Sequence, residues 1–220
     1  MNASEVGTML DVSTRNNRLL VEAVWTRWQP RMQRMAKIVK SGELGEVTGI
    51  SSAFTFQGDL TNNYRLDPSL GGGALLDVGV YQAHLWLMLL NEDVSFSIES
   101  VERTSGATGV DLTTRAQLQL NNSVAAQLLA SFDLPAQQRI EVTGTTATMR
   151  TGEGEAFTLW KQPSTLLIGE TVEHFEADDA FALMVHGVSA AIEAGKPTIF
   201  PAASSLRAAE ITDAISRFKN

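Results

Sequence analysis

The 220-residue chain contains no cysteine. It therefore offers no thiolate nucleophile, no cysteine ligand for zinc or an iron–sulfur cluster, and no disulfide. Positive charge is also scarce, because 17 Lys and Arg stand against 25 Asp and Glu, which gives a net charge of −8. Since sequence-independent binding to nucleic acid or anionic membranes depends on a basic surface, neither is an expected partner.

The chain also lacks a long apolar run and a leader peptide. No apolar run approaches the roughly 20 residues that cross a bilayer. The first residues, MNASEVGTMLD, include neither the basic nor the apolar region of a signal peptide. We therefore expect a cytoplasmic protein. Its hydrophobic content of 44%, with four Trp and nine Phe, predicts a folded domain with a real core.

Hydrophobic periodicity predicts a helical start, a β-rich middle and a helical end. Helices are expected at 3–17, 30–41, 74–90, 178–194 and 201–218. Asn2 or Ser4 can cap the first of these helices, and Gly195, followed by Pro197, is expected to end the fourth. Strands are expected at 18–28, 48–56, 94–102, 113–120, 123–132, 139–144, 146–150 and 156–161, with a hairpin turn at Asn121–Asn122. This order predicts an α+β fold, in which helices pack on one face of a large, open, predominantly antiparallel mixed sheet.

The second predicted helix, 30–41, is amphipathic. Apolar residues lie on one side, while basic residues, Arg31 and Arg34 among them, lie around the other. We expect this basic face to be solvated and the helix to end at Gly42, because glycine readily adopts the left-handed conformation that follows a helix.

The segment YRLDPSLGGGALLDVGVY, at 64–81, is the richest in chemistry. Three glycines that open a helix allow another molecule to approach the backbone and leave N–H groups free at the positive end of the helix dipole. Asp77 and Tyr81 are four residues apart and therefore project from the same helix face, which His84 and Met88 continue. A carboxylate beside a phenol is a workable proton-transfer pair. The alternative is that Asp77 bridges backbone groups while Tyr81 is a core aromatic with a hydrogen-bonded hydroxyl.

Other common catalytic or binding patterns are missing. No G-x-G-x-x-G is present and no βαβ alternation precedes the first strand, so a nucleotide-binding half is not encoded in this chain. The three histidines, His84, His174 and His186, are too scattered for a metal site, and no metal is expected. There is no G-x-S-x-G nucleophile motif.

Two segments in order carry a family resemblance. EAVWTRWQP at 22–30, followed by RLDPSLGGGALLDVGVY at 65–81, resembles the C-terminal part of the Gfo/Idh/MocA oxidoreductases, above all the dihydrodiol dehydrogenase and glucose–fructose oxidoreductase branch. The resemblance extends over essentially the whole chain, including FALMVHGVSAAIEAGKP at 181–197. It implies a C-terminal domain like that of glyceraldehyde-3-phosphate dehydrogenase, which follows an N-terminal Rossmann domain in these NAD(P)-dependent enzymes.

The resemblance also implies roles for individual residues. Tyr81 occupies the position of the catalytic tyrosine, the proton donor to a carbonyl oxygen, and Asp77 matches its acidic partner. The implied substrate-binding residues are Trp25, Arg27, Phe54 and Arg65. The implied cofactor is NAD or NADP, and the implied substrates are small molecules with a secondary alcohol or carbonyl, such as sugars, polyols or trans-dihydrodiols.

One departure from the family pattern concerns the catalytic lysine. The family carries it in a Glu-Lys-Pro motif, and none of the five lysines here has that context. By the resemblance, Met1 lies just past that motif, 1–17 is a remnant helix of an absent Rossmann domain, and 18–220 is the substrate and dimerisation domain. We therefore expect a truncated oxidoreductase, inactive or incomplete by itself. A non-catalytic sheet module for dimerisation or ligand binding is the alternative.

The open sheet suggests how the chain would meet a second copy. A sheet covered by helices on one face leaves the other face, which we expect to be apolar, for a partner. In the family that face forms a homodimer, and we expect the same here. Alternation along two strands offers four candidates for such a surface: Leu118, Leu120, Val124 and Leu128.

Overall fold

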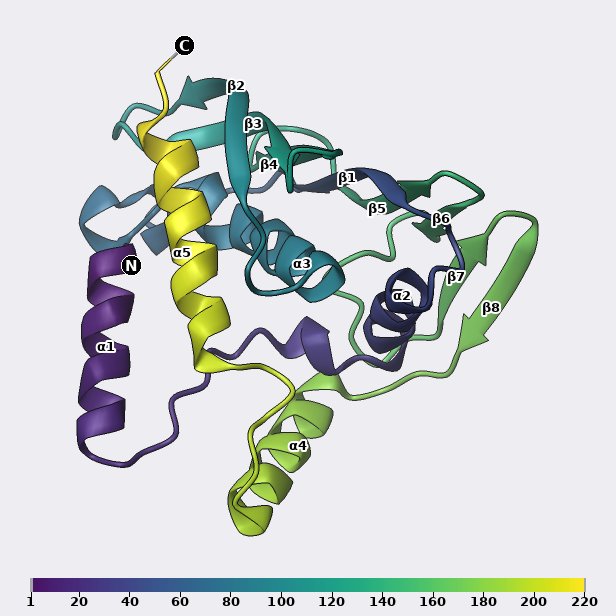
Figure 1. Cartoon of the computed structure of the whole chain (residues 1–220). Coiled ribbons are helices and arrows are strands. Elements are labelled where there is room, and N and C mark those ends of the chain that lie inside the picture. The colour runs from purple at the N-terminus through teal and green to yellow at the C-terminus, as the bar shows by residue number, and fades with distance from the viewer. Residues whose placement is uncertain (1, 220) are drawn as a thin grey trace.

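Eight strands form one open sheet in the computed structural model, which describes residues 2–219 (Figure 1). Their order across the sheet is β2-β3-β4-β1-β5-β6-β7-β8. The strands are β1 (Val47–Thr55), β2 (Phe96–Ser105), β3 (Asp111–Leu120), β4 (Val124–Ser131), β5 (Gln137–Gly144), β6 (Thr148–Thr151), β7 (Ser164–Ile168) and β8 (Thr171–Phe175). β1 runs parallel to β4, and the other neighbouring pairs of these strands are antiparallel, so the expected mixed sheet is confirmed.

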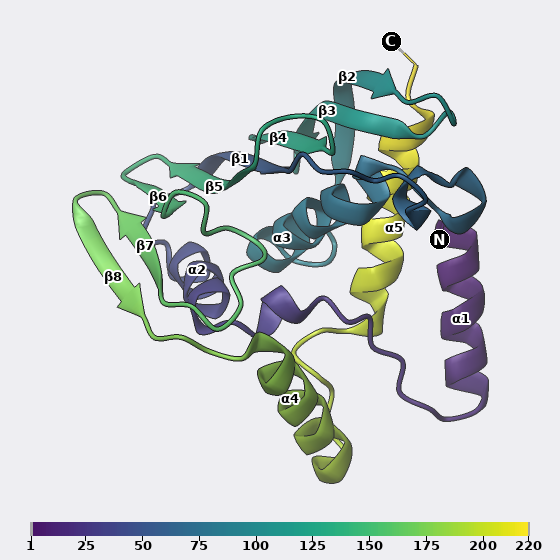
Figure 2. The ribbon, with the colours of Figure 1, turned by 180° about the vertical axis from the view of Figure 1, so that it is seen from behind.

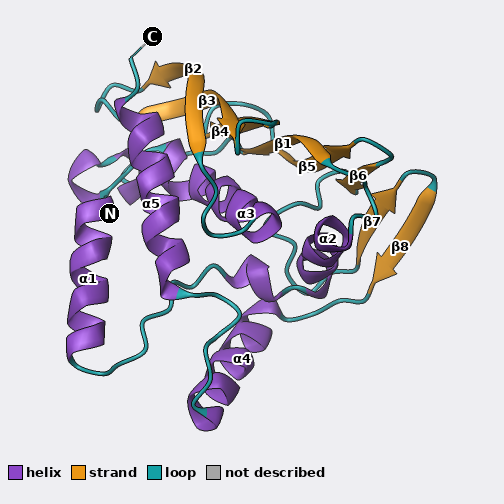
Figure 3. Cartoon of the chain, viewed as in Figure 1, coloured by secondary structure: helices purple, strands orange, loops and turns teal. Residues whose placement is uncertain are grey.

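Five α-helices lie on the same side of this sheet, which Figure 3 shows by colour and Figure 2 shows from behind. They are α1 (Ala3–Arg15), α2 (Pro30–Ser41), α3 (Val80–Leu90), α4 (Ala180–Ala194) and α5 (Ala202–Arg217). The predicted ends are confirmed by local geometry: Asn2 caps α1, while Gly42 and Gly195 are left-handed after α2 and α4.

Helix α3 is the centre of the core. Every side chain from Gln82 to Leu89 is buried, as its apolar sequence predicts. A short π-helix, Leu75–Gly79, leads into it. The expectation that no apolar stretch is long enough to cross a membrane is wrong by length and composition, because Pro68–Leu90 passes that test, but 72% of its most apolar window is buried in the fold. Burial in the core therefore accounts for its hydrophobicity.

The helix-free face of the sheet is polar, which corrects the expectation of an apolar surface. Four residues expected on that face instead point into the core and are at most 4% exposed: Leu118, Leu120, Val124 and Leu128. The helix-free face is lined instead by Arg115, Gln117 and Gln127, which alternate with these residues on β3 and β4, and by Ser51 of β1 and Arg139 of β5. The period-two pattern was read in the right register, but the apolar set faces the helices.

Residues 18–28 do not form the predicted strand. Residues 18–24 pair with no strand within 2–219, and Trp25–Trp28 is a short 3-10 helix, η1. The apolar character of this segment comes from packing, because Trp28 is 8% exposed and its ring meets Phe200 edge-on at 6.1 Å. Hydrophobicity alone therefore gave the wrong local structure.

The predicted strand at 156–161 is also wrong. This segment is irregular, and the sheet continues instead through β7 and β8, which the sequence reading missed. Ala156 and Phe157 are fully buried, but they belong to a loop that packs across the core. The next two strands are only five residues each, too short to show clear alternation.

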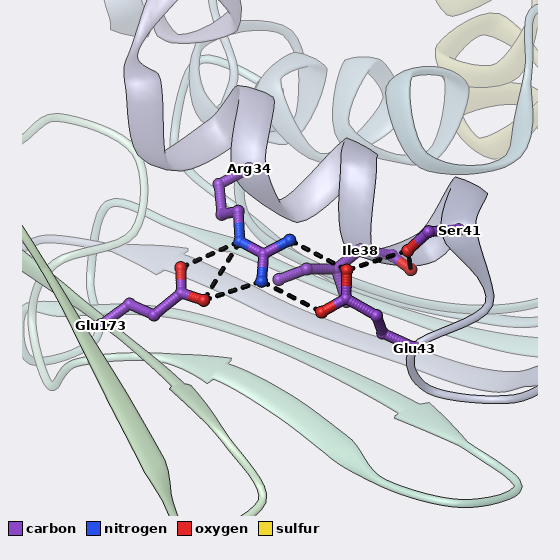
Figure 4. Close-up of polar contacts among 5 residues, drawn as sticks. All are labelled: Arg34, Ile38, Ser41, Glu43 and Glu173. Atoms are coloured by element: carbon purple, nitrogen blue, oxygen red, sulfur yellow. Dashed lines mark hydrogen bonds and ion pairs between the residues drawn. The ribbon is translucent and has the colours of Figure 1, made fainter.

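Helix α2 is tied to the outer hairpin by Arg34 (Figure 4). The Arg34 guanidinium lies between two carboxylates, with Nη2 2.7 Å from Glu173 Oε1 of β8 and Nη1 2.9 Å from Glu43 Oε1. Glu43 also accepts a hydrogen bond from Ser41. The expected solvated basic face is therefore only partly correct, and Arg31 of the same helix is 2% exposed.

Candidate active site

Tyr81 lies in the first turn of α3, where three aromatic rings meet. Its ring centroid is 5.8 Å from that of Phe54 in β1 and 6.1 Å from that of Phe157, which follows β6. The rings of Phe54 and Phe157 stack on each other, with centroids 5.6 Å apart and planes 4° from parallel. The structure thus brings together Tyr81 and Phe54, which are both site residues predicted from the resemblance.

The surroundings of Tyr81 keep its hydroxyl protonated. Burial raises the pKa of Tyr81, a hydrogen bond with the Trp25 side chain acts in the opposite direction, and the charge of Asp77 raises the pKa further. Tyr64 and Glu22 add smaller contributions in the same direction as Asp77. Because tyrosine ordinarily has a pKa of about 10, the phenol is a proton donor at neutral pH.

Asp77 is held by two side chains of the loop that precedes the glycines. Arg65 Nε donates to Asp77 Oδ2 at 2.7 Å, and the Tyr64 hydroxyl donates to Oδ1 at 3.1 Å. These partners are side chains, so the alternative in which the Asp77 carboxylate bridges backbone groups is not observed. Asp77 therefore acts on Tyr81 through its charge, and the predicted residues Asp77 and Arg65 lie together.

The three glycines that open this helix serve a different purpose from the one expected. The Gly72 and Gly73 N–H groups donate to the carbonyl oxygens of Asp67 and Arg65, both at 2.9 Å. A Cβ on Gly72 would lie 2.6 Å from the Arg65 carbonyl oxygen, and Gly73 has a φ of +119°. The Leu75 N–H donates to Asp111 Oδ2. These N–H groups are occupied within the chain, so the glycines permit a tight loop and do not form an anion site.

Trp25 extends the aromatic wall toward the surface. Its ring stacks on Phe181 of α4 with centroids 4.8 Å apart, and Phe181 in turn meets Trp160 edge-on at 6.1 Å. Trp25 is buried, whereas Trp160 and Phe181 are 49% and 44% exposed. The sequence did not indicate the outer two rings, because partial exposure of a large aromatic ring becomes visible only in three dimensions. It did not indicate the fully buried Phe157 either, because the contacts of Phe157 are with residues remote in sequence.

Arg27 lies apart from this group. Its guanidinium is buried, ion-pairs through Nη2 with Glu92 Oε1 at 3.1 Å, and lies 4.5 Å above the Phe200 ring centroid. Burial lowers the pKa of Arg27, and the charge of Glu92 counteracts that effect. In this structure Arg27 joins η1 to the end of α3, and its predicted role in substrate binding stays a prediction.

His84 continues the helix face of Asp77 and Tyr81, as expected, but it is buried at 1% exposure. Its Nε2 lies 3.2 Å from Glu22 Oε2. Although burial favours the protonated form of Glu22, the hydrogen bond and the charge of His84 lower the pKa of that carboxyl overall. The pair attaches the irregular segment before η1 to α3.

Neither a metal site nor a dinucleotide site is found in the described part of the chain. Residues 2–219 contain no group of three or more metal-binding side chains. They also contain no strand–helix turn rich in glycine of the kind that holds a pyrophosphate, because the one glycine run uses its N–H groups internally. The residues present therefore place a phenol proton donor among aromatic rings and do not fit a Rossmann-type cofactor cradle.

Comparison with known proteins supports this assignment of the domain. Residues 32–150, more than half of the chain, match the GFO/IDH/MocA C-terminal domain. Among curated proteins, an uncharacterized oxidoreductase, ORF334, from Rhizobium meliloti is 28% identical over 99% of this chain and 67% of its own length. The NADP(+)-dependent D-xylose 1-dehydrogenase 2 from Haloferax volcanii is 28% identical over 97% of this chain and 66% of its own length.

Other relatives match a smaller part of the chain. The trans-1,2-dihydrobenzene-1,2-diol dehydrogenase of Mus musculus is 28% identical over 79% of this chain and 50% of its own length. The present chain thus spans one half to about two thirds of the length of these three relatives.

Solved structures share the fold. A 3-ketoreductase from Actinomadura kijaniata, in complex with NADP and TDP-benzene, superposes with a TM-score of 0.84 at 24% identity, over 98% of this chain and 67% of that one. An aldose-aldose oxidoreductase from Caulobacter crescentus, with glycerol, gives a TM-score of 0.86 at 19% identity over 98% and 66%. The sheet order, the helix that carries Asp77 and Tyr81, and the sequence match agree: this chain belongs to the Gfo/Idh/MocA oxidoreductase family and comprises its C-terminal domain.

Proposed function

We propose that this chain is the substrate-binding and proton-donating part of an NAD(P)-dependent oxidoreductase. Its substrate is a secondary alcohol or carbonyl in a sugar, polyol or trans-dihydrodiol. The observation that carries the proposal is Tyr81, a phenol kept protonated at neutral pH within an aromatic pocket. Family membership and the names of the xylose and dihydrodiol dehydrogenase relatives support the substrate class.

Different residues of the chain have different roles in the proposed reaction. In the direction of carbonyl reduction, Tyr81 donates its hydroxyl proton to the carbonyl oxygen, which removes the developing negative charge. The charge of Asp77 adds to burial in raising the pKa of Tyr81, while Arg65 holds Asp77 in place. Trp25 and Phe54 supply apolar walls that orient the carbon skeleton and exclude water, because their rings flank the tyrosine.

NAD or NADP is the cofactor we propose for the complete enzyme, where it supplies or accepts the hydride. Support comes from the NADP(+) dependence of the Haloferax volcanii relative and from the NADP in the Actinomadura kijaniata complex. We assign no cofactor contact to this chain, since the described residues lack a dinucleotide cradle. Consistent with this, we propose that 1–17 belongs with a nucleotide-binding domain of a longer enzyme and that 18–220 is the substrate and dimerisation domain.

We further propose that the protein is cytoplasmic and forms a homodimer through the helix-free face of the sheet. That face is open and carries opposite charges in register, with Glu102 opposite Arg115 and Glu141 opposite Arg150. Sedimentation velocity tests this: a dimer is expected, and Gln127→Glu at the centre of the face should weaken it. A wild-type monomer at millimolar concentration would refute the proposed dimer.

Ligand binding tests the proposed function directly. The chain has only two tyrosines, so ¹³Cζ-labelled tyrosine gives two NMR resonances, and Tyr64→Phe assigns the Tyr81 signal. We expect D-xylose, a polyol or a trans-dihydrodiol to shift the Tyr81 resonance saturably. NADPH fluorescence should remain unchanged, because no dinucleotide site lies within residues 2–219. Absence of a saturable Tyr81 shift with all three compound classes would overturn the proposal.

A matched variant shows whether such a shift reports on the pocket. Phe54→Leu removes one wall of the tyrosine pocket while retaining an apolar side chain, so we expect weaker ligand binding. Leu166→Ile, in the buried part of β7, changes the core without touching Tyr81 and should leave binding unchanged. Equal binding by wild type and Phe54→Leu would place the ligand elsewhere.

A further inference from the structure

We infer that Arg31 is a positioning residue for the active site: it holds the irregular segment 156–160 so that Phe157 closes one side of the pocket around Tyr81. The inference rests on the proposed function of Tyr81, but it can be tested without substrate or cofactor. The sequence reading had placed Arg31 on a solvated helix face, and the family resemblance gave it no role.

Segment 156–160 is held by side chains in place of regular secondary structure. Arg31 Nη2 donates to the carbonyl oxygen of Ala156 at 2.8 Å, and Gln29 Nε2 donates to that of Leu159 at 2.7 Å. Gln138 Oε1 accepts from the N–H groups of the two intervening residues, 157 and 158, both at 2.8 Å. The segment is buried only at Ala156 and Phe157. Since buried backbone groups must have hydrogen-bond partners, we attribute the path of the segment to these contacts.

Burying the charged Arg31 side chain costs desolvation free energy, which suggests that its hydrogen bond to segment 156–160 has a structural purpose. The side chain is 2% exposed, and its nearest counter-ion, Glu155, lies 3.7 Å from Nη1. Nε and Nη1 have no hydrogen-bond partner. Burial lowers the pKa of Arg31 to about 10, and Glu155 only partly opposes this. Because an apolar side chain would avoid this desolvation cost, we attribute the retention of arginine to its bond with the 156 carbonyl.

The position of the segment determines the surroundings of Tyr81. Phe157, adjacent to the carbonyl that Arg31 binds, is fully buried and packs on both Phe54 and Tyr81. Three residues further along, Trp160 meets Phe181, which stacks on Trp25. Burial is the largest cause of the raised pKa of Tyr81, so a displaced Phe157 would admit water and bring that pKa down.

The test is a pH titration of the Tyr81 ¹³Cζ resonance in the full chain. Arg31→Met removes the hydrogen bond and the charge while retaining most of the side-chain volume. We expect the midpoint of the Tyr81 titration to fall toward the ordinary pKa of tyrosine. The matched control is Arg34→Met, one turn further along α2, because Arg34 binds Glu43 and Glu173 and does not contact the segment (Figure 4). Its Tyr81 midpoint should equal that of the wild type.

Two further variants keep the inference falsifiable if Arg31→Met does not fold. Gln29→Leu and Gln138→Leu each remove other bonds to the same segment, and both should lower the Tyr81 midpoint in the same direction. Folded Arg31→Met with an unchanged Tyr81 midpoint would overturn the positioning role. So would a midpoint unchanged in both glutamine variants. If only the proposed function is wrong, the ligands will not shift the Tyr81 resonance, but the pH titrations of these variants will still give the expected midpoints.

Discussion

Gly187→Ala tests whether α4 packs so closely on η1 that no side chain fits at position 187. A Cβ at this position would lie 2.8 Å from Trp28 Nε1 and 3.0 Å from Cδ1. Trp28 is 8% exposed and packs against Phe200, so its ring has little room to move. Overpacking of this kind costs about 1–3 kcal/mol, whereas alanine in place of glycine inside a helix gains about 0.8–1 kcal/mol.

The expected net effect is a loss of roughly 1 kcal/mol, which corresponds to a Tm lower by about 2–4 °C for a chain of this size. Gly7→Ala in α1 is the matched control, because a Cβ there meets nothing within 4 Å. It should raise Tm by a similar amount through helix propensity alone. Thermal unfolding followed by circular dichroism measures both variants. Equal increases in Tm would refute the argument that Trp28 blocks a side chain at Gly187.

Two other predictions concern the charged Arg34 and the titratable Tyr81. Arg34→Met should lower the free energy of unfolding by about 1 kcal/mol in low salt and by less in 1 M salt, because the ion pairs with Glu43 and Glu173 are partly exposed. Urea unfolding at both salt concentrations measures this effect. A loss of the same size at both concentrations would contradict the prediction. The raised pKa of Tyr81 means that its contribution to stability is complete below the ordinary tyrosine value and is lost as pH rises through the folded value. The free energy of unfolding should therefore fall more steeply at alkaline pH in wild type than in Tyr81→Phe, and parallel curves would count against a buried phenol.

Local patterns predicted much of the fold and part of the candidate site. The helix that carries Asp77 and Tyr81 was predicted because four-residue spacing on a helix is a local property. The glycine stops at Gly42 and Gly195 were predicted for the same reason, since each depends on the conformation of one residue. Alternation predicted most of the strands, but not that β1 pairs in parallel with β4.

Long-range packing explains what the sequence reading missed. Phe157 was assigned to a strand because its neighbours are apolar, but their burial comes from contact with Phe54 and Tyr81, which are remote in sequence. Arg31 was assigned to a solvated face because charge usually indicates exposure. Only the tertiary fold places a backbone carbonyl where this guanidinium can reach it.

The position of β1 in the middle of the sheet has a consequence for the order of folding. β1 is the first strand to be synthesised, yet both its neighbours come much later: Gly49 pairs with Ala125 of β4 and Thr55 with Gln137 of β5. The β2–β3–β4 meander can form from local hairpins, whereas β1 pairs only with strands far along the chain. Because closure of such distant pairings is slow, we expect the insertion of β1 to limit assembly of the sheet. On that expectation the ring of Phe54 is among the last parts of the candidate site to reach its place.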